Sequence, residues 1–206
     1  MAQLFEIHPD NPQPRLLRQA CALLDKGEVL AVPTDSGYAL GCLLENKTAL
    51  ERICRIRQID SSHNFTLVCR DLSELSLYSK VDNQAFRLIK NNTPGPYTFI
   101  LKATKEVPRR LMNEKKKTIG IRVPQNPIAQ ALLGELGEPL MSTSLILPGS
   151  EMAESDPYEI RDRLSQVVDL IIDGGYLGEQ PTTVVDFSAD NPEVVRYGAG
   201  DPTPFE

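Results

Sequence analysis

The chain has little histidine and no tryptophan, and this scarcity limits the chemistry it can carry. His8 and His63 are the only imidazoles among 206 residues, which disfavours a Ser-His-Asp hydrolase or a histidine-rich zinc site. The phosphate-loop pattern G-x-x-x-x-G-K-[ST], the dinucleotide pattern G-x-G-x-x-G and the hydrolase pattern G-x-S-x-G are also missing. Any chemistry must therefore come from another arrangement of side chains.

Long apolar runs and paired cysteines are missing as well. No run of about 18 apolar residues could form a membrane-spanning helix. The first 14 residues carry Glu6 and Asp10 and lack the apolar region of a signal peptide, so we expect a cytoplasmic protein. The four cysteines lie in apolar segments without C-x-x-C spacing, which predicts reduced core residues and no metal site: Cys21, Cys42, Cys54 and Cys69.

Positive charge is in deficit overall but concentrated locally. The net charge of −6 excludes a globally basic nucleic-acid binder. Residues 102–117 nevertheless hold seven lysines and arginines against two glutamates. Such a run is either a solvated surface or a binding patch for RNA or another polyanion, and the sequence leaves both open.

Hydrophobic periodicity predicts one mixed α/β domain over residues 1–206, with a core of about 15–200. Apolar content of 41% and charged content of 24% suit a globular domain. Helices interleaved with short strands favour a mixed sheet, α+β in character, with helices on its faces. We expect helices at 15–26, 46–57, 71–78, 82–90, 127–136 and after Asp156, and strands at 29–32, 39–44, 65–70, 97–103, 118–123, 140–144, 167–173, 182–187 and 194–197.

The stretch from Glu28 to Leu44 organises the rest. An apolar run reaches Pro33, where the missing N–H should end the sheet ladder. Residues 34–38 then present short oxygen-bearing side chains, in an ordinary turn or at a ligand site.

Arg55 and Arg57 would point about 200° apart on a helix, so they share a ligand only if the helix unwinds near Arg57.

Arginines and hydroxyl side chains recur at the ends of the predicted strands. Arg122 lies inside an apolar strand, where burial requires an anionic partner. Such side chains bind phosphate and carboxylate groups, which is compatible with nucleotidyl transfer or with simple anion binding. The set comprises Thr34, Ser36, Tyr38, Arg55, Arg57, Arg122, Ser144, Thr182, Thr183 and Arg196.

Six short motifs in order resemble the threonylcarbamoyl-AMP synthase family, also called YrdC-like, and most closely its YciO-type branch. The resemblance covers about residues 16–200 and implies a twisted mixed sheet around a concave, positively lined cavity, as in the YrdC/RibB-like fold. The motifs are Pro33-Thr34-Asp35-Ser36-Gly37-Tyr38-Ala39-Leu40-Gly41, Arg55-Ile56-Arg57, Pro94-Gly95-Pro96-Tyr97-Thr98, Ile121-Arg122-Val123-Pro124, Pro181-Thr182-Thr183-Val184-Val185-Asp186 and Arg196-Tyr197-Gly198.

The resemblance implies an activity and site roles. Threonine, bicarbonate and ATP would give threonylcarbamoyl-AMP and pyrophosphate for tRNA modification at adenosine 37, with Mg²⁺ required. Arg55, Arg57 and Ser144 would be catalytic, and double-stranded RNA or tRNA binding is also implied. The nucleotide phosphates would be held by Arg55, Arg57, Ser144, Thr182 and Arg196, and the amino acid by Thr34, Tyr38 and Arg122.

Three positions depart from the family pattern. Arg55 replaces a lysine and Thr182 a serine, and both changes keep the chemical character. Ile146 stands where the family has an asparagine, so a donor to phosphate is lost, worth about 1.5–3 kcal/mol. The first hypothesis is therefore a weak synthase or one with another substrate; the others are an RNA-binding paralogue with little catalysis and a simple anion-binding protein.

Overall fold

A computed structural model of the chain describes residues 1–60 and 62–206. Within these ranges, eleven strands form one mixed sheet in the order β1-β9-β2-β3-β8-β4-β7-β6-β10-β11, with β5 paired to β6. The strands are β1 (Gln3–Glu6), β2 (Leu30–Thr34), β3 (Gly37–Leu43), β4 (Thr66–Val68), β5 (Ser79–Lys80), β6 (Tyr97–Ala103), β7 (Thr118–Arg122), β8 (Leu140–Ser144), β9 (Leu170–Asp173), β10 (Thr183–Asp186) and β11 (Glu193–Arg196).

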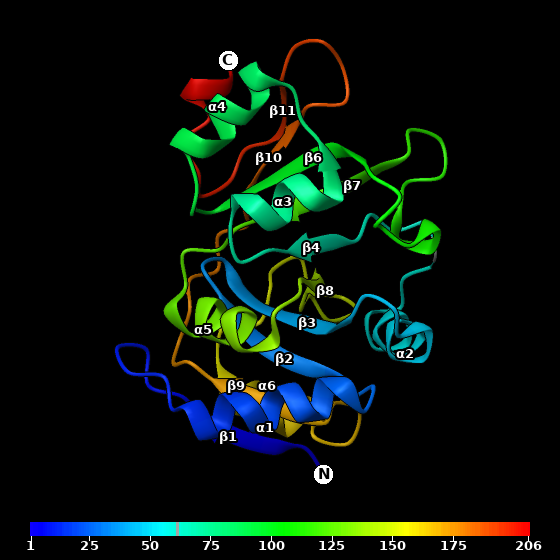
Figure 1. The fold of residues 1–206 in the computed structure, drawn as a ribbon. Helices are drawn as coiled ribbons and strands as arrows, with labels where there is room; N and C mark the ends of the chain where they lie inside the picture. Colours follow the sequence, from blue (N-terminus) through cyan, green and yellow to red (C-terminus); the bar gives the residue numbers. More distant parts are fainter. Residues whose placement is uncertain (61) are drawn as a thin grey trace.

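Helices cover both faces of this sheet (Figure 1). Helices α1 and α5 lie side by side and enclose one apolar cluster against β2 and β9. A second, larger cluster lies under α2, α3, α4 and α6 and includes Phe205 near the C-terminus. The helices are α1 (Pro14–Asp25), α2 (Lys47–Arg57), α3 (Leu72–Tyr78), α4 (Asn83–Asn91), α5 (Pro127–Leu136) and α6 (Pro157–Leu164), with short 3₁₀ turns at Arg109–Leu111 and Thr203–Phe205.

Side-chain caps fix where most of these helices begin. Asn46, Asp71, Asp82, Asn126 and Asp156 each accept a hydrogen bond from a backbone N–H in the first turn. The ends of α2 and α5 are marked by left-handed residues, Gln58 at φ 53° and Gly137 at φ 75°. These local signals explain why the predicted mixed α/β architecture is confirmed.

Several details differ from the sequence predictions, among them the unpredicted two-residue strand β5, which pairs with β6. Strand β2 continues through Pro33 to Thr34, because its pairing with β9 covers only Leu30 and Ala31 and no backbone donor is needed on that side at Pro33. Strand β1 was not predicted; it pairs with β9 in parallel. Residues 65–70 form a strand only at Thr66–Val68.

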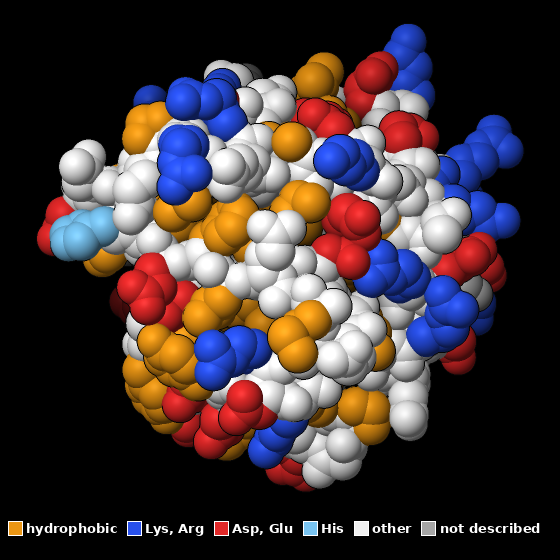
Figure 2. Space-filling model, turned by 90° about the horizontal axis from the view of Figure 1, so that it is seen from below, with side chains coloured by type: hydrophobic (Ala, Val, Ile, Leu, Met, Phe, Trp, Pro, Cys, Tyr) orange, Lys and Arg blue, Asp and Glu red, His pale blue; other side chains and the backbone are white. Residues whose placement is uncertain are grey.

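The structure also describes the cysteines, the lengths of the helices and the distribution of surface charge. All four cysteines are free, and three of them are buried. No helix in the described ranges is long and apolar enough to cross a membrane. The face shown in Figure 2 intersperses acidic and basic side chains instead of gathering one sign of charge, as the overall composition suggests.

Candidate functional site

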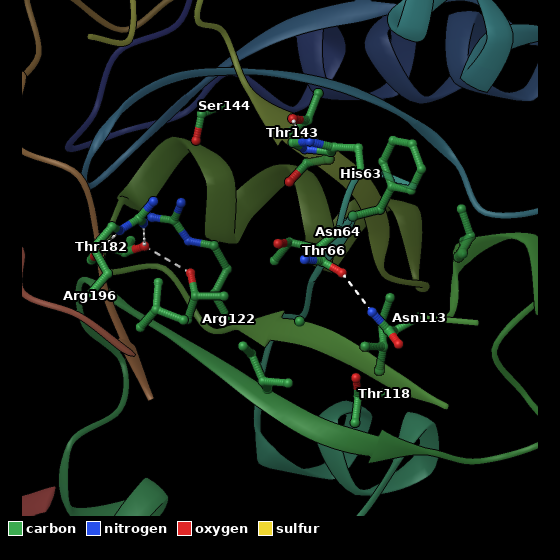
Figure 3. A pocket seen from close by; sticks show the side chains of 18 of the residues that line it. His63, Asn64, Thr66, Asn113, Thr118, Arg122, Thr143, Ser144, Thr182 and Arg196 are labelled. Atoms are coloured by element: carbon green, nitrogen blue, oxygen red, sulfur yellow. Dashed lines mark hydrogen bonds between the residues drawn. The ribbon is translucent and has the colours of Figure 1, made fainter. Parts of the chain in front are cut away.

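A cavity of about 460 Å³ opens on one face of the sheet. Its walls come from β4, β6, β7, β8, β10 and β11, from the end of α2 and from the segment that follows α2. Figure 3 shows Arg122, Thr182 and Arg196 at one end, and Asn64, Asn113 and Thr118 at the other. The sheet thus gathers residues that are far apart in the sequence around one hollow.

Three guanidinium groups line this cavity. Arg57, the last residue of α2, donates from Nε to the Ile146 carbonyl at 2.9 Å and from Nη1 to the Thr143 hydroxyl. Arg196 at the end of β11 donates to the Thr182 carbonyl at 3.0 Å and to its hydroxyl at 2.9 Å. In the described residues neither guanidinium forms an ion pair with a carboxylate, so both retain positive charge for a ligand.

Burial acts on all three arginines. It lowers the pKa of Arg57 and of Arg122, and it lowers the pKa of Arg196 together with the charge of Arg122. Arginine remains protonated despite such shifts. These shifts mean that the charged forms are incompletely solvated, and an anion in the cavity would relieve that cost.

Arg122 is the deepest of the three, with 6% of its surface exposed. Its Nη2 donates to Asp35 and, at 3.1 Å, to the Ser36 hydroxyl. The anionic partner that the sequence required is therefore confirmed as Asp35, which also accepts a hydrogen bond from the Gln125 N–H at 2.8 Å. The Nε atom of Arg122 is buried without a hydrogen-bond partner, and such an orphan donor favours a ligand oxygen beside it.

A close backbone approach holds Arg196 in place. A Cβ atom on Gly198 would lie 2.2 Å from the Pro181 carbonyl oxygen, so only glycine fits there. The Ala199 N–H donates to that same carbonyl at 2.8 Å. Thr182 in turn hydrogen-bonds Thr98 at 2.8 Å, so the strand ends and the guanidinium form one rigid unit.

Comparison with known proteins now places the chain. The family model Sua5_yciO_yrdC, described as "Telomere recombination", matches residues 22–198. The chain belongs to this Sua5/YciO/YrdC family. It is 70% identical over 205 residues to the Escherichia coli (strain K12) protein "Uncharacterized protein YciO", with 100% of both chains covered. A crystal structure of E. coli YciO superimposes with a TM-score of 0.96 over 100% of both chains.

More distant members of the family carry an activity in their names. The chain is 29% identical over 187 residues to "Threonylcarbamoyl-AMP synthase" of Vibrio vulnificus (strain YJ016), covering 88% of this chain and 98% of that protein. The crystal structure of P. abyssi Sua5 complexed with L-threonine has a TM-score of 0.86 at 23% identity, over 95% of this chain and 57% of that one. The second likeness shows the shared fold alone.

The structure gathers five of the predicted site residues of this family member. Four lie within contact of the cavity from strand or helix ends and one, Ser144, is exposed at its rim. They are Arg57, Arg122, Ser144, Thr182 and Arg196.

Arg55 is not brought to the same cavity. Helix α2 continues through Arg57 and its backbone turns left-handed only at Gln58. Arg55 is therefore exposed on another side of α2, beside a shallower hollow that Lys47, Cys54 and Arg110 also line. The 200° divergence expected from helix geometry is what the structure shows.

Thr34, the last residue of β2, and Tyr38 in β3 flank the turn that carries Asp35 and Ser36, and neither lines the cavity. The Thr34 hydroxyl donates to the Gly37 carbonyl at 2.6 Å and accepts from the Ser36 N–H at 3.1 Å. The Tyr38 hydroxyl donates to the Gly175 carbonyl at 2.8 Å, and burial raises its pKa. The Thr34 hydroxyl thus fixes the turn that carries Asp35 and Ser36, whereas the Tyr38 hydroxyl ties β3 to the segment after β9. The contact of both side chains with an amino acid stays a prediction.

Ile146 lies at the cavity rim, half-buried and outside both apolar clusters. Its carbonyl holds Arg57, while its side chain presents no donor where the family pattern has asparagine. A second hollow of about 410 Å³ adjoins it and is lined by Ser36, Ser144 and Arg196 together with Met152 and Glu179. The rim is therefore shared between two compartments.

Sequence reasoning missed several cavity residues. His63 and Asn64 follow α2 in a polar run whose only sequence signal is the end of a helix, and Thr143 lies between two serines with no motif of its own. Asn64 accepts from Asn113 Nδ2 at 3.3 Å across the cavity mouth. In the described ranges no group of three or more His, Cys, Asp or Glu side chains gathers where it could hold a metal ion.

Proposed function

We propose that the chain binds ATP and an amino-acid-derived carbamate in this cavity and acts as a threonylcarbamoyl-AMP synthase, slowly or on a related substrate. The observation that carries the proposal is the convergence of Arg57, Arg122 and Arg196 on one cavity without carboxylate partners for two of them. The name of the 29% identical Vibrio protein and the L-threonine complexed with P. abyssi Sua5 support it.

The chemistry suits a site without an obvious acid or base. A carbamate oxygen formed from threonine and bicarbonate attacks the α-phosphorus of ATP, the bond to the β-phosphate oxygen breaks, and pyrophosphate leaves. Transfer at phosphorus depends mainly on positioning and on stabilising the developing charge. Fixed guanidinium groups supply both, because each is already held by a carbonyl or hydroxyl of the protein.

The proposal gives the residues around the cavity separate roles. Arg57 and Ser144 would hold phosphate oxygens at the rim, with Thr182 and Arg196 on the opposite strand ends. Arg122, with its unpartnered Nε atom, would receive the carboxylate of the amino acid. Magnesium would arrive with the triphosphate, whose oxygens and water complete its coordination. The product would serve tRNA modification at adenosine 37.

Ile146 is the reason for expecting slow turnover. An asparagine donor to a phosphate oxygen would contribute about 1.5–3 kcal/mol, or roughly tenfold to more than a hundredfold in rate. The loss of this donor leaves the guanidinium groups intact. We therefore expect the protein to bind ATP but to turn it over slowly.

The test is direct synthesis. The protein is incubated with ATP, Mg²⁺, bicarbonate and each amino acid in turn, and mass spectrometry looks for the carbamoyl adenylate while pyrophosphate release is measured. We expect slow, bicarbonate-dependent product. No product with any amino acid, together with no ATP binding at millimolar concentration, contradicts the proposal.

RNA binding is the second candidate, favoured by the exposed lysines beside the cavity. Lys115, Lys116 and Lys117 are exposed, and Lys116 lines the cavity and pairs with Asp186 at 3.2 Å. Few aromatic side chains are present for base stacking, so binding should be electrostatic and weaken steeply with salt.

Substitution of the lysines separates this candidate from nonspecific attraction. Lys115→Ala with Lys117→Ala should weaken double-stranded RNA binding and flatten its salt dependence, because two phosphate contacts are lost. Arg15→Ala with Arg18→Ala, on the exposed face of α1, removes the same charge and should change little. Equal losses in the two variants, or salt-insensitive binding, contradict the candidate.

A further inference from the structure

His63 lies on the cavity wall next to Arg57, and one hydroxyl joins the two. The Nε2 atom of His63 is 3.1 Å from the Thr143 Oγ1 atom. That same oxygen accepts a hydrogen bond from Nη1 of Arg57. The imidazole is half-buried and its ring meets Phe65 edge-on, with centroids 5.4 Å apart and planes at 70°. His63, Thr143 and Arg57 form a short hydrogen-bonded row that ends at the cavity.

The charges around His63 make its protonation sensitive to a ligand. Burial lowers its pKa, the charge of Arg57 lowers it further, and Asp60 acts in the opposite sense. An anion bound to Arg57 would cancel the positive charge that disfavours the imidazolium. The other charged side chains that line the cavity are Lys116, Arg122, Asp186 and Arg196.

We propose that His63 is a proton-linked member of the anion-binding group, and that it takes up one proton from solvent when a phosphate group binds at Arg57. This rests on the proposed anion-binding role of Arg57. The hydroxyl of Thr143 explains how the change is transmitted. A hydroxyl oxygen can accept two hydrogen bonds and donate one.

In the free protein the Thr143 hydroxyl donates to an unprotonated Nε2 atom of His63 and accepts from Arg57. After proton uptake, Nε2–H donates to Thr143 Oγ1 while Arg57 continues to donate to it. The hydroxyl proton of Thr143 then turns toward the ligand oxygen. The bound anion thus receives a hydrogen bond from the Thr143 hydroxyl and lies near the positive charge of the His63 imidazolium.

Thermodynamic linkage gives the sign of the effect. Because binding raises the pKa of His63, anion affinity must rise as the pH falls through that pKa. A rise of one pKa unit corresponds to about a tenfold change in affinity between the two protonation limits. A purely structural histidine would produce no such dependence.

The first test uses proton NMR of the two histidine rings. The chain offers only His8 and His63, and His8 is exposed near the N-terminus. Both are titrated with and without sulfate, which mimics phosphate and keeps its charge over the titrated range. We expect sulfate to raise the pKa of His63 and to leave the His8 resonances unchanged. An unchanged or lowered pKa of His63 on sulfate binding overturns this proposal.

Variants extend the test to ATP. His63→Gln retains a hydrogen-bonding amide near Thr143 and cannot titrate, so the ratio of wild-type to variant affinity for ATP should rise from pH 8 to pH 6. The protonation of ATP itself cancels in this ratio. Thr143→Val should shrink the sulfate-induced pKa change of His63, and His8→Gln should match the wild type in every measurement.

Failure of this proposal is distinguishable from failure of the proposed function. If neither ATP nor sulfate binds, both are overturned. If ATP binds to wild type and His63→Gln with the same pH dependence, only the role of His63 is overturned.

Discussion

Two arginines of the same helix, Arg52 and Arg57, are held in opposite ways. Arg52 pairs with Asp169 at 2.8 Å and Glu28 at 3.3 Å and donates to the Val167 carbonyl at 2.9 Å. Arg57, five residues later, has only a hydroxyl and a carbonyl as partners among the described residues. One guanidinium is neutralised by the fold and the other is left charged at a cavity.

The pKa of each arginine reflects this difference. The hydrogen bond with Asp169 raises the pKa of Arg52, against the effect of burial, whereas burial alone lowers the pKa of Arg57. An unpaired charge is costly to bury, so a poorly solvated arginine without a carboxylate partner beside a cavity is a candidate for binding an anion. Arg52 therefore has a structural role, whereas Arg57 is the candidate for binding a ligand.

Replacing Arg57 should have the largest effect on binding. Arg57→Ala removes charge-assisted hydrogen bonds to phosphate worth about 1.5–3 kcal/mol, so ATP affinity should fall roughly tenfold to more than a hundredfold. The free energy of unfolding should change little, because the lost hydrogen bonds are offset by removal of a poorly solvated charge. Calorimetric titration and urea unfolding of the variant measure the two quantities, and a large stability loss with unchanged ATP binding would reverse the assignment.

Replacing Arg52 should do the opposite. Arg52→Ala leaves Asp169 and Glu28 facing each other without their shared cation, at a cost of about 2 kcal/mol in unfolding free energy. ATP affinity should match the wild type, since Arg52 does not line the cavity. Urea unfolding provides the measurement, and weakened ATP binding at full stability would remove the contrast between the two arginines.

Ile146→Asn should add a hydrogen-bond donor beside Arg57. Ile146 lies at the cavity rim outside both apolar clusters, so the amide faces the ligand rather than a packed core. ATP affinity or turnover should rise roughly tenfold, because the added hydrogen bond contributes about 1.5 kcal/mol of free energy. An earlier thermal transition with no gain in ATP binding would place the side chain among structural residues instead. Leu77→Asn, at an exposed position outside the cavity lining and both apolar clusters, is the control.

Much of the fold could be predicted because its signals are local. Residues close together in the sequence determine the helix caps, such as Asn46 and Asn126, and the apolar faces of α1 and α5. Strand β1 has no such signal: Gln3–Glu6 has no fully buried residue, and the strand forms because β9 offers a free edge far along the chain. The prediction that the ladder ends at Pro33 was wrong for a similar reason. Within β2, strand β9 pairs only with Leu30 and Ala31, so no partner on that side requires the N–H that proline lacks.

The site divides along the same line. Sequence chemistry predicted that Arg122 needs an anion, yet Asp35 as that partner lies 87 residues away and is fixed only by the sheet. Helical geometry predicted that Arg55 and Arg57 diverge, and they do. The contact of His63 with Thr143, 80 residues apart, has no sequence signal at all. The sequence showed which types of residue could form a site. Only the tertiary structure showed which residues lie next to one another.

The smallest expected effect is a pH dependence of the unfolding free energy that comes from His63, which lies beside Arg57. Burial and the charge of Arg57 hold the pKa of His63 below its ordinary value of about 6.5. The unfolded chain therefore binds more protons than the native state as the pH falls below that value. The contribution of His63 to stability is complete above about pH 7 and is lost as the pH falls through the native pKa.

Urea unfolding between pH 8 and pH 5.5 should show this slope in wild type and a shallower one in His63→Gln. Sulfate should also flatten it in wild type, because an anion at Arg57 brings the native pKa of His63 closer to the unfolded value. Arg18→Ala serves as the reference, because it removes an exposed cation on α1, and its slope over this range should equal that of the wild type. Identical slopes for wild type and His63→Gln would mean that Arg57 does not act on His63, and the row of three side chains would then be a structural contact only.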